Sequence, residues 1–250
     1  MTDPARRGLS GITAAILAGG LGTRLRSILT DKPKVLAEIH GRPFLSYLLD
    51  QLNDAGVRRV VLLTGYRGGE IRSVFGDSYQ NIKLRYSEEL SPLGTAGAVR
   101  LALPMIDSDP TLVMNGDALC DADIRRFYSW HCAGDRAGSL LLAEVPDSSR
   151  YGRVALDQEG RVLRFDEKSG HSGLGLINAG VYLLSRRVLE SIPEGRAVSI
   201  EHEVFPNWIG QGLHGYQTRN RFIDIGTPES YAEAHHFFSP TPPGAIDRQS

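Results

Sequence analysis

The sequence predicts an α/β domain built on a mostly parallel sheet with helices on both of its faces. Strand-like and helix-like segments alternate through residues 1–135, glycine-containing loops separate them, and strand-like runs follow one another after residue 138. Alternation is typical of strands joined by crossover helices, which pair in parallel. Successive strands joined by turns pair antiparallel, so the second half should contribute a mixed part of the sheet.

In the first half, a strand is expected over residues 12–18, where small and β-branched residues run up to Gly19-Gly20. A helix is expected over residues 43–55, because apolar residues recur at helical spacing and Gly56 follows as a stop signal. The alternation continues with strands expected over residues 57–64, 82–86 and 111–114. Helices are expected between them, over residues 70–75 and 94–103.

The second half contains strand-like runs at 139–144, 152–156, 162–166 and 179–184. A last helix is expected over residues 229–238, because Thr227 can cap it and Pro228 suits its first position. One domain should therefore span residues 12–238, with a flexible N-terminus at 1–11. The proline-rich tail at 239–250 should also be flexible.

Composition excludes several classes of protein. A length of 250 residues with 41% hydrophobic content can bury one sizeable core. A net charge of -1 gives no field that would gather nucleic acid or an anionic membrane, so any phosphate binding must be local. The two cysteines are too few for a disulfide scaffold, and no apolar run is long enough for a membrane span or signal peptide. We expect a cytoplasmic protein without nucleic-acid or membrane partners.

The loop after the first strand, Leu17 to Leu25, contains three glycines and Arg24. Glycine lets backbone N–H groups approach a phosphate, and arginine offers fork-shaped donors to its oxygens. The run lacks the Lys-Thr ending of a P-loop and the glycine spacing of a dinucleotide fold. In isolation such a run is more often an ordinary glycine-rich turn, so its meaning depends on the other motifs.

Together with Pro33-Lys34-Val35-Leu36, this loop resembles the signature of the sugar-1-phosphate nucleotidyltransferases. Further motifs resemble that family in chain order: Gly94-Thr95-Ala96-Gly97, Asn115-Gly116-Asp117, Glu167-Lys168, Asn178-Ala179-Gly180 and Asp224-Ile225-Gly226-Thr227-Pro228. The resemblance implies a three-layer α/β/α domain with a central mixed, mainly parallel sheet, the Rossmann-like nucleotidyltransferase fold. It also implies a nucleotide-binding half at 12–137, a sugar-binding half at 138–238, and Mg²⁺ as cofactor.

By the same resemblance, the enzyme transfers a nucleoside monophosphate from a nucleoside triphosphate (NTP) to a sugar 1-phosphate and releases pyrophosphate. The implied catalytic residues are Arg24, Lys34 and Asp117. The implied nucleotide-binding residues are Leu17, Ala18, Gly19, Gly20, Gly22, Thr23, Arg24, Gly94, Thr95 and Gly116. The implied sugar-phosphate-binding residues are Glu167, Lys168 and Asn178, and the implied metal ligands are Asp117 and Asp224.

These residue types suit the reaction. Two phosphate groups must approach each other, so positive charge has to neutralise their repulsion before in-line attack. Mg²⁺ prefers carboxylate, phosphate and water oxygens, which a pair of aspartates can complete. Alternatives stay open: Asp117 could only shape a turn, Asp224 could cap the last helix although Thr227 is better placed, and Glu167 could order Lys168 instead of touching the sugar.

A narrower resemblance, to D-glycero-D-manno-heptose 1-phosphate guanylyltransferases, rests on four segments: Gly22 to Ser27, Asn115-Gly116-Asp117, Arg150-Tyr151-Gly152-Arg153 and Phe222 to Gly226. It makes GTP the first choice of nucleotide, with ATP, dTTP, UTP and CTP open, and mannose or glucose 1-phosphate as alternative acceptors. Base selection should rest on backbone near Ala18-Gly19 and on residues 88–97. Rival functions are a non-catalytic nucleotide-sugar sensor and an enzyme for another phosphorylated alcohol. A homo-oligomer is compatible with the sequence.

Overall fold

The computed structural model describes residues 9–20, 32–166 and 173–239. Five residues of the expected site, Gly22, Thr23, Arg24, Glu167 and Lys168, lie outside the described residues, as do 1–8 and 240–250 of the expected flexible ends. Residues 9–11 form a short 3₁₀ turn with Leu9 buried, packed on the start of the domain.

A central sheet runs through the described chain in the order β11-β10-β12-β7-β1-β4-β6-β5; off this path, β9 pairs with β12 and β13 pairs with β9. The strands are β1 (Thr13–Leu17), β4 (Arg59–Thr64), β5 (Ser78–Tyr79), β6 (Ile82–Glu88), β7 (Thr111–Asn115), β9 (Gly138–Val145), β10 (Arg153–Leu156), β11 (Val162–Asp166), β12 (Gly175–Leu184) and β13 (Leu213–Thr218). The four central strands β7, β1, β4 and β6 are parallel. Strand β12 joins them antiparallel, so the expected mixed, mainly parallel sheet is confirmed.

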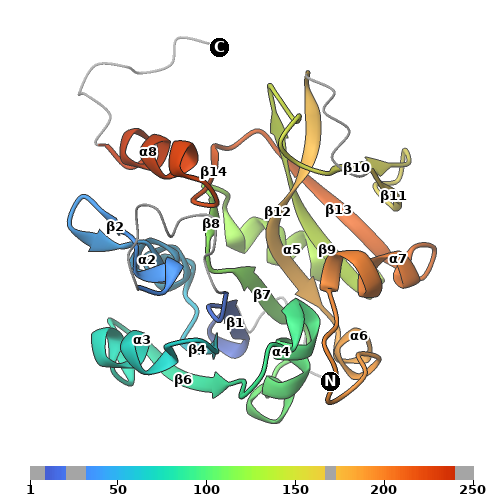
Figure 1. Cartoon of the computed structure of the whole chain (residues 1–250). Coiled ribbons are helices and arrows are strands. Elements are labelled where there is room, and N and C mark those ends of the chain that lie inside the picture. The colour runs from blue at the N-terminus through green and yellow to red at the C-terminus, as the bar shows by residue number, and fades with distance from the viewer. Residues whose placement is uncertain (1–8, 21–31, 167–172, 240–250) are drawn as a thin grey trace.

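Helices cover both faces of this sheet (Figure 1). They are α2 (Phe44–Ala55), α3 (Gly68–Phe75), α4 (Gly94–Ala102), α5 (Ile124–Cys132), α6 (Arg186–Glu190), α7 (Phe205–Trp208) and α8 (Pro228–Phe237). Along β1, Ala14 and Ile16 face the core under α2 and α5, whereas Ala15 faces the core under α4 and α6. Because side chains alternate between the faces of a strand, this division confirms three layers.

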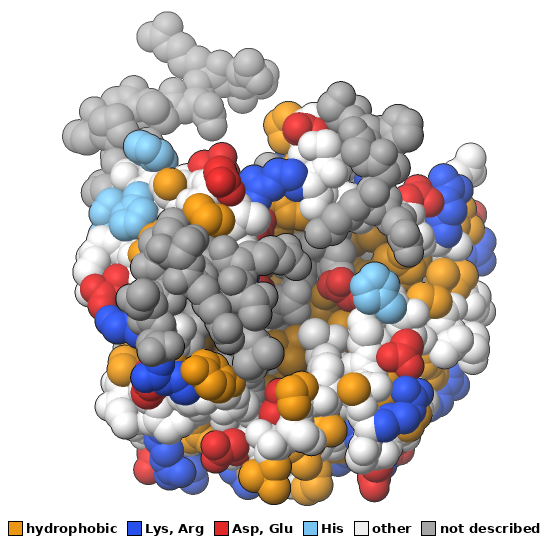
Figure 2. Space-filling view, viewed as in Figure 1, with side chains coloured by type: hydrophobic (Ala, Val, Ile, Leu, Met, Phe, Trp, Pro, Cys, Tyr) orange, Lys and Arg blue, Asp and Glu red, His pale blue; other side chains and the backbone are white. Residues whose placement is uncertain are grey.

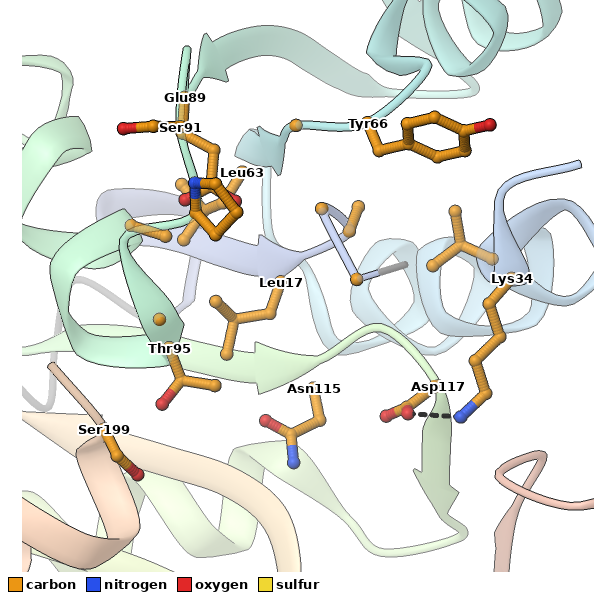
Figure 3. Close-up of a pocket in the computed structure, with 18 of the residues that line it drawn as sticks. Leu17, Lys34, Leu63, Tyr66, Glu89, Ser91, Thr95, Asn115, Asp117 and Ser199 are labelled. Atoms are coloured by element: carbon orange, nitrogen blue, oxygen red, sulfur yellow. Dashed lines mark hydrogen bonds and ion pairs between the residues drawn. The ribbon is translucent and has the colours of Figure 1, made fainter. Parts of the chain in front are cut away.

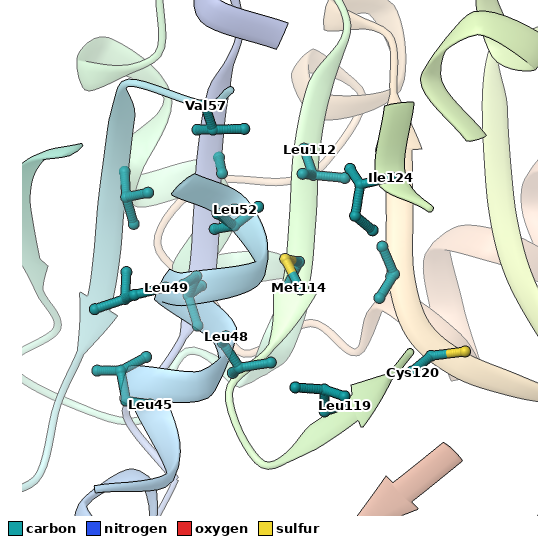
Figure 4. Close-up of a cluster of buried hydrophobic side chains, with 14 of the residues drawn as sticks. Leu45, Leu48, Leu49, Leu52, Val57, Leu112, Met114, Leu119, Cys120 and Ile124 are labelled. Carbon is teal, nitrogen blue, oxygen red and sulfur yellow. The ribbon is translucent and has the colours of Figure 1, made fainter. Parts of the chain in front are cut away.

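Helix α2 shows why the sequence folds this way. Its Leu45, Leu48, Leu49 and Leu52 are fully buried against the sheet and pack with Met114 of β7 (Figure 4). The helix ends at Gly56, whose φ of 96° is a left-handed conformation that glycine adopts without a steric cost. The spacing of the leucines and the glycine stop, both visible in the sequence, thus fix the position of the helix.

A separate ribbon of two short strands lies beside the end of the sheet. Strand β14 (Phe222–Asp224) pairs antiparallel with β8 (Ala118–Cys120), which follows directly after β7 and Asp117. Helix α8 begins after this ribbon with Thr227 as its cap and Pro228 in its first turn, as expected. The ribbon matters because it brings two distant aspartates to the same end, Asp224 as the last residue of β14 and Asp117 just before β8.

The smallest remaining elements are the strands β2 (Glu38–Ile39) and β3 (Arg42–Pro43), 3₁₀ turns at Lys34–Leu36 and Leu103–Met105, and a π-helical turn at Ile200–Val204. The π-helical turn was not expected from the sequence. Such turns are rare and often occur at functional sites, and this one borders the cavity described next.

Candidate active site

A cavity of about 600 Å³ opens at the carboxyl ends of the four parallel strands. Leu17 ends β1, Leu63 lies near the end of β4, and Asn115 ends β7; all three line the cavity (Figure 3). The space-filling view shows the hollowed face of the molecule, with acidic and basic side chains interspersed over its described surface rather than gathered into one basic area (Figure 2). A small anionic ligand fits this setting better than a nucleic acid.

Backbone after β1 forms part of the cavity wall. Leu17, Ala18, Gly19 and Gly20 all line the cavity, as the sequence predicts. The Ala18 N–H donates to the Leu63 carbonyl oxygen at 2.8 Å, which holds the start of this loop against β4. A Cβ atom at Gly19 would lie 3.1 Å from the Gly65 nitrogen and 3.2 Å from Oε1 of Glu89, so any other residue would require these neighbours to shift by a few tenths of an ångström.

Gly116 supports this wall from behind and does not itself line the cavity. Its N–H donates to the Leu17 carbonyl oxygen at 2.9 Å, and a Cβ atom at this position would collide with that oxygen. The prediction that Gly116 contacts the nucleotide therefore stays a prediction, while its packing against Leu17 is plain.

Lys34 and Asp117 form one end of the cavity. Lys34 opens a 3₁₀ turn that is anchored by the buried side chains of Val35 and Leu36. Its Nζ atom lies 2.6 Å from Oδ2 of Asp117, and the lysine side chain is only 14% exposed, against 42% for the aspartate. Figure 3 shows this pair at one end of the cavity. An ammonium held in a partly desolvated position is well placed to meet phosphate oxygens.

Asp224 lies beside this pair although it does not line the cavity. The Ile225 N–H donates to the Asp117 carbonyl oxygen at 2.9 Å, which joins the two aspartate-bearing turns. A Cβ built at Gly226 would lie 2.6 Å from Oδ1 of Asp224 and 3.7 Å from Nζ of Lys34. The two aspartates predicted to bind metal are therefore brought together with Lys34.

A partly buried tyrosine, Tyr151, holds Asp224 in place. The Tyr151 hydroxyl donates to Oδ2 of Asp224, and the Gly226 N–H donates to Oδ1 at 2.8 Å. Burial and the neighbouring Asp224 raise the pKa of Tyr151 above its ordinary value, so the hydroxyl stays a neutral donor. Arg150 adds a charge 3.9 Å from the carboxylate.

The opposite end of the cavity is formed by the loop that opens α4. Glu89, Ser91, Gly94 and Thr95 line it, together with Ser199 from the segment before the π-helical turn (Figure 3). The Ala96 N–H donates to the Val198 carbonyl oxygen at 2.9 Å, and the Ile200 N–H donates to Oγ1 of Thr95 at 2.8 Å. The loop is thus fixed by a segment from the far half of the chain.

Gly94→Ala should disrupt this end of the cavity. Gly94 has φ of 68°, and an added Cβ would lie 2.6 Å from the Val198 carbonyl oxygen. Left-handed strain costs about 1–2 kcal/mol and the collision adds to it, so we expect a fall in melting temperature of several degrees and weaker NTP binding. Gly195→Ala is the matched control, because Gly195 has φ of 71° with nothing within 4 Å of its Cβ position. Equal effects of the two substitutions in thermal unfolding would mean that the contact with Val198 is unimportant.

Asn178, expected on the sugar side, does not line the cavity. Its Nδ2 group donates to Oε1 of Glu201 at 2.8 Å and to the Tyr182 hydroxyl at 2.9 Å. Glu201 itself does line the cavity. The prediction that Asn178 contacts the sugar is not tested by this arrangement, which instead joins it to the cavity through Glu201.

Several residues that line the cavity were not predicted from the sequence, among them Tyr66, Ser199, Glu201 and His202. Glu89 to Pro92 belong to the loop expected to select the base, but no side chain there was singled out. One signal could have drawn attention to Ser199-Ile200-Glu201-His202-Glu203: four of these five residues are polar, and the stretch lies between the buried residues Val198 and Val204. Polar residues within an apolar context often mark a site.

Within the described ranges, no group of three or more His, Cys, Asp and Glu side chains is arranged to hold a metal ion. Asp117 and Asp224 form a pair only, which suits a cation that takes most of its ligands from phosphate and water. Among the helices that the structure describes, none is both long enough and apolar enough to cross a membrane.

Comparisons with known proteins show the family of this chain. Residues 13–240 match the family described as Nucleotidyl transferase. The chain is 36% identical over 222 residues to the D-glycero-alpha-D-manno-heptose 1-phosphate guanylyltransferase of Aneurinibacillus thermoaerophilus, covering 88% of this chain and 96% of that enzyme. It is 37% identical over 224 residues to the mannose-1-phosphate guanylyltransferase of Mycobacterium tuberculosis, covering 88% of this chain but only 62% of that enzyme's length.

A crystal structure of HddC from Yersinia pseudotuberculosis complexed with GMP-PN superposes with a TM-score of 0.81 at 37% identity. The match covers 91% of this chain and 99% of that one, so the two share the whole fold rather than a fragment. Because the family match spans nearly the whole described domain, the chain belongs to the nucleotidyl transferase family.

Proposed function

We propose that this chain transfers GMP from GTP to D-glycero-D-manno-heptose 1-phosphate, giving a GDP-sugar and pyrophosphate. The heptose is favoured because the match to the Aneurinibacillus enzyme extends over 96% of that enzyme's length. Mannose 1-phosphate is the second acceptor, supported by the Mycobacterium relative, of which this chain spans 62%. Guanine is supported by those relatives and by the complex of HddC with GMP-PN.

The single observation that carries the choice of base is the position of Glu89. One carboxylate oxygen accepts the Leu93 N–H at 3.0 Å, and the other lies beside Gly19 and Gly65 at the cavity wall. Guanine presents two adjacent donors, N1–H and the N2 amino group, and a carboxylate accepts from both. Adenine and cytosine present a ring-nitrogen acceptor beside their amino group, and uracil and thymine flank their single N–H with carbonyl oxygens. A carboxylate at this wall therefore favours guanine.

At the opposite end of the cavity, Lys34 is proposed to stabilise charge on the α-phosphate. An oxygen of the sugar phosphate forms a bond to the α-phosphorus while the bond from that phosphorus to the bridging oxygen of the β-phosphate breaks. Negative charge moves onto the leaving pyrophosphate during this exchange. A fixed ammonium beside the reacting phosphate lowers the barrier without having to reorganise. Arg24 and Lys168, which lie outside the described residues, are proposed to bind the leaving pyrophosphate and the sugar phosphate.

Asp117 and Asp224 are proposed to hold Mg²⁺. The fit rests on two hard carboxylate donors from joined turns, next to the lysine proposed to meet the α-phosphate. When bound, the ion would supply positive charge to the phosphate oxygens. The protein's own contribution is to orient the two carboxylates, Asp117 through Lys34 and Asp224 through Tyr151 and the Gly226 N–H.

A pyrophosphate-release screen tests the proposal. Purified protein with Mg²⁺ is combined with GTP, ATP, dTTP, UTP or CTP and with heptose, mannose or glucose 1-phosphate. Release with GTP and heptose 1-phosphate should dominate. A different winning pair would replace the proposed substrates, and silence in every combination while nucleotide sugars still bind would favour a sensor.

Glu89→Gln should weaken the preference for GTP. The glutamine oxygen can still accept the Leu93 N–H, so the loop keeps its shape, but the charge-assisted contacts to guanine are lost. Such hydrogen bonds contribute about 1.5–3 kcal/mol, so kcat/KM for GTP should fall roughly 10- to 150-fold with a smaller change for the other NTPs. The exposed neighbour Glu88, which does not line the cavity, supplies the control Glu88→Gln. A uniform loss with all five NTPs would assign Glu89 a structural role.

A further inference from the structure

Glu201 stands out among the cavity residues because its carboxylate is already held in place by two protein donors, the part-buried Asn178 and the fully buried Tyr182. It belongs to the π-helical turn Ile200–Val204, far along the chain from the phosphate-side motifs. We propose that Glu201 binds hydroxyl groups of the acceptor sugar and that Asn178 is a positioning residue for it. This inference rests on the proposed function, since it assigns the sugar-binding part of the same cavity.

Two donors converge on a single oxygen of Glu201. Oε1 accepts from Nδ2 of Asn178 at 2.8 Å and from the Tyr182 hydroxyl at 3.0 Å. Tyr182 is fully buried, and both burial and the nearby Glu201 raise its pKa well above the ordinary value, so it donates as a neutral hydroxyl. The carboxylate is therefore fixed in orientation while its residue lines the cavity.

The hydrogen bonds of Asn178 are directed to protein groups. Nδ2 donates to Glu201 and to the Tyr182 hydroxyl, and Oδ1 accepts the Gly180 N–H at 3.0 Å. An amide nitrogen has two N–H groups, and both are used here. Asn178 has no donor left for a sugar hydroxyl, so its effect on the substrate must pass through Glu201.

The backbone around this cluster is shaped to hold it. The pairing of β12 with β9 shifts register between Asn178 and Tyr182, so the ladder between these two strands is interrupted at this point. Gly180 has φ of 71°, and a Cβ there would lie 2.7 Å from Nδ2 of Asn115, another residue of the cavity. The cluster is thus packed against Asn115 at the end of β7, a residue that Figure 3 shows between Thr95 and Asp117.

A fixed carboxylate suits a sugar ring. Neighbouring hydroxyl groups of a pyranose can both donate to one carboxylate, and hydrogen bonds to a charged group are roughly twice as strong as neutral ones. A site built to bind a hydroxyl rejects an analogue that lacks it, because the carboxylate is then left unpaired. The acceptor class is accordingly a sugar phosphate with free ring hydroxyls, and deoxy analogues should be poor substrates.

The test compares GDP with GDP-mannose by calorimetry, which needs no turnover. GDP-mannose should bind the wild-type protein more tightly than GDP. Glu201→Gln should weaken GDP-mannose binding roughly 10- to 150-fold, as expected for loss of a charged hydrogen-bonding group, and leave GDP binding unchanged. Glu203→Gln is the matched control, because Glu203 lies on the same turn but pairs with Arg196 at 3.0 Å and does not line this cavity.

Asn178→Ala distinguishes positioning from direct contact. It should raise the KM of the sugar 1-phosphate with little change in the KM of GTP, and it should add little to the effect of Glu201→Gln in the double variant, since both act on the same contact. Full additivity would overturn the positioning role. Equal losses for GDP and GDP-mannose in Glu201→Gln, or equal binding of the two ligands by the wild-type protein, would overturn the sugar contact.

Failure of the proposed function has a different signature. If the pyrophosphate screen selects another base, the same comparison uses that nucleoside diphosphate and its sugar conjugate, and the outcome for Glu201 is judged there. If the wild-type protein binds neither guanine nucleotides nor any other nucleotide sugar, the proposed function and the inference built on it both fall. If the wild-type protein turns over its substrates and Glu201→Gln leaves the difference in affinity between GDP and GDP-mannose unchanged, only the inference about Glu201 falls.

Discussion

Replacing Lys34 with alanine is expected to lower kcat about 10²- to 10³-fold, the size seen when one preorganised charge-stabilising group is removed. Its ammonium is held 2.6 Å from Asp117 and is only 14% exposed, so little solvent screens it. Charge on the α-phosphate oxygens develops most strongly as the bonds exchange, and the lysine should therefore act more on the transition state than on bound GTP. The dissociation constant of GTP, measured by calorimetry, should change by less than about tenfold.

Lys32→Ala is the matched control for that experiment. Lys32 lies two residues away, is 56% exposed and pairs with Glu38 at 3.3 Å, so its loss should leave kcat within about twofold, as for other surface charges. Lys34→Arg should restore only part of the rate, because a guanidinium does not occupy the place of a compact ammonium. If Lys34→Ala weakened GTP binding as much as it lowered kcat, the lysine would be a nucleotide-binding residue instead.

The central layer of the fold could be predicted because buried parallel strands leave a strong local signal. β1, β4 and β7 are mostly apolar runs that end in loops, whereas β6 alternates apolar and polar residues, and all four lie within about two residues of the positions expected from the sequence. Helix α2 was equally clear, since its leucines repeat at helical spacing. In these segments local pattern and tertiary packing demand the same residues.

Strand β13 was missed for the opposite reason. Residues Leu213–Thr218 include a histidine, a glycine and a glutamine, and their burial alternates only weakly. The strand forms because β9 offers a parallel partner over six residues, from Gly138 to Ala143. Its stability comes from pairing with a distant strand, which a local pattern cannot show.

The residues of the candidate site also fall into two groups, those that local motifs predict and those that only contacts between distant segments bring to the cavity. Lys34, Asp117 and the Gly94-Thr95 loop were predicted from motifs, and each lines the cavity. Glu201 was missed because the π-helical turn reaches the cavity only through contacts such as that between Ile200 and Thr95. The proximity of Asp224 to Asp117 likewise depends on the pairing of β14 with β8, although family resemblance anticipated their shared role.

Asp224→Asn is expected to raise the Mg²⁺ concentration needed for half-maximal activity by about tenfold or more, and to lower kcat about 10²-fold at saturating metal. The amide keeps the shape of the carboxylate but removes the charge that a hard divalent cation requires. Tyr151→Phe should give a smaller change in the same direction, because it removes the hydroxyl that orients Asp224 and keeps the charge. Losing such an outer contact typically costs roughly 10- to 100-fold in metal affinity or activity.

Metal binding can be measured apart from turnover. Mn²⁺ in complex with a non-hydrolysable GTP analogue reports its affinity by electron paramagnetic resonance, so a ligand role should weaken binding in Asp224→Asn and, to a lesser extent, in Tyr151→Phe. Asp121→Asn supplies the control, because Asp121 is exposed and pairs with Arg221 at 3.1 Å beside the same ribbon. An unchanged Mn²⁺ affinity in Asp224→Asn would assign this carboxylate to holding Tyr151 and the Gly226 turn. Asp117 would then be the remaining acidic ligand at this end of the cavity, and the metal would depend more on phosphate oxygens.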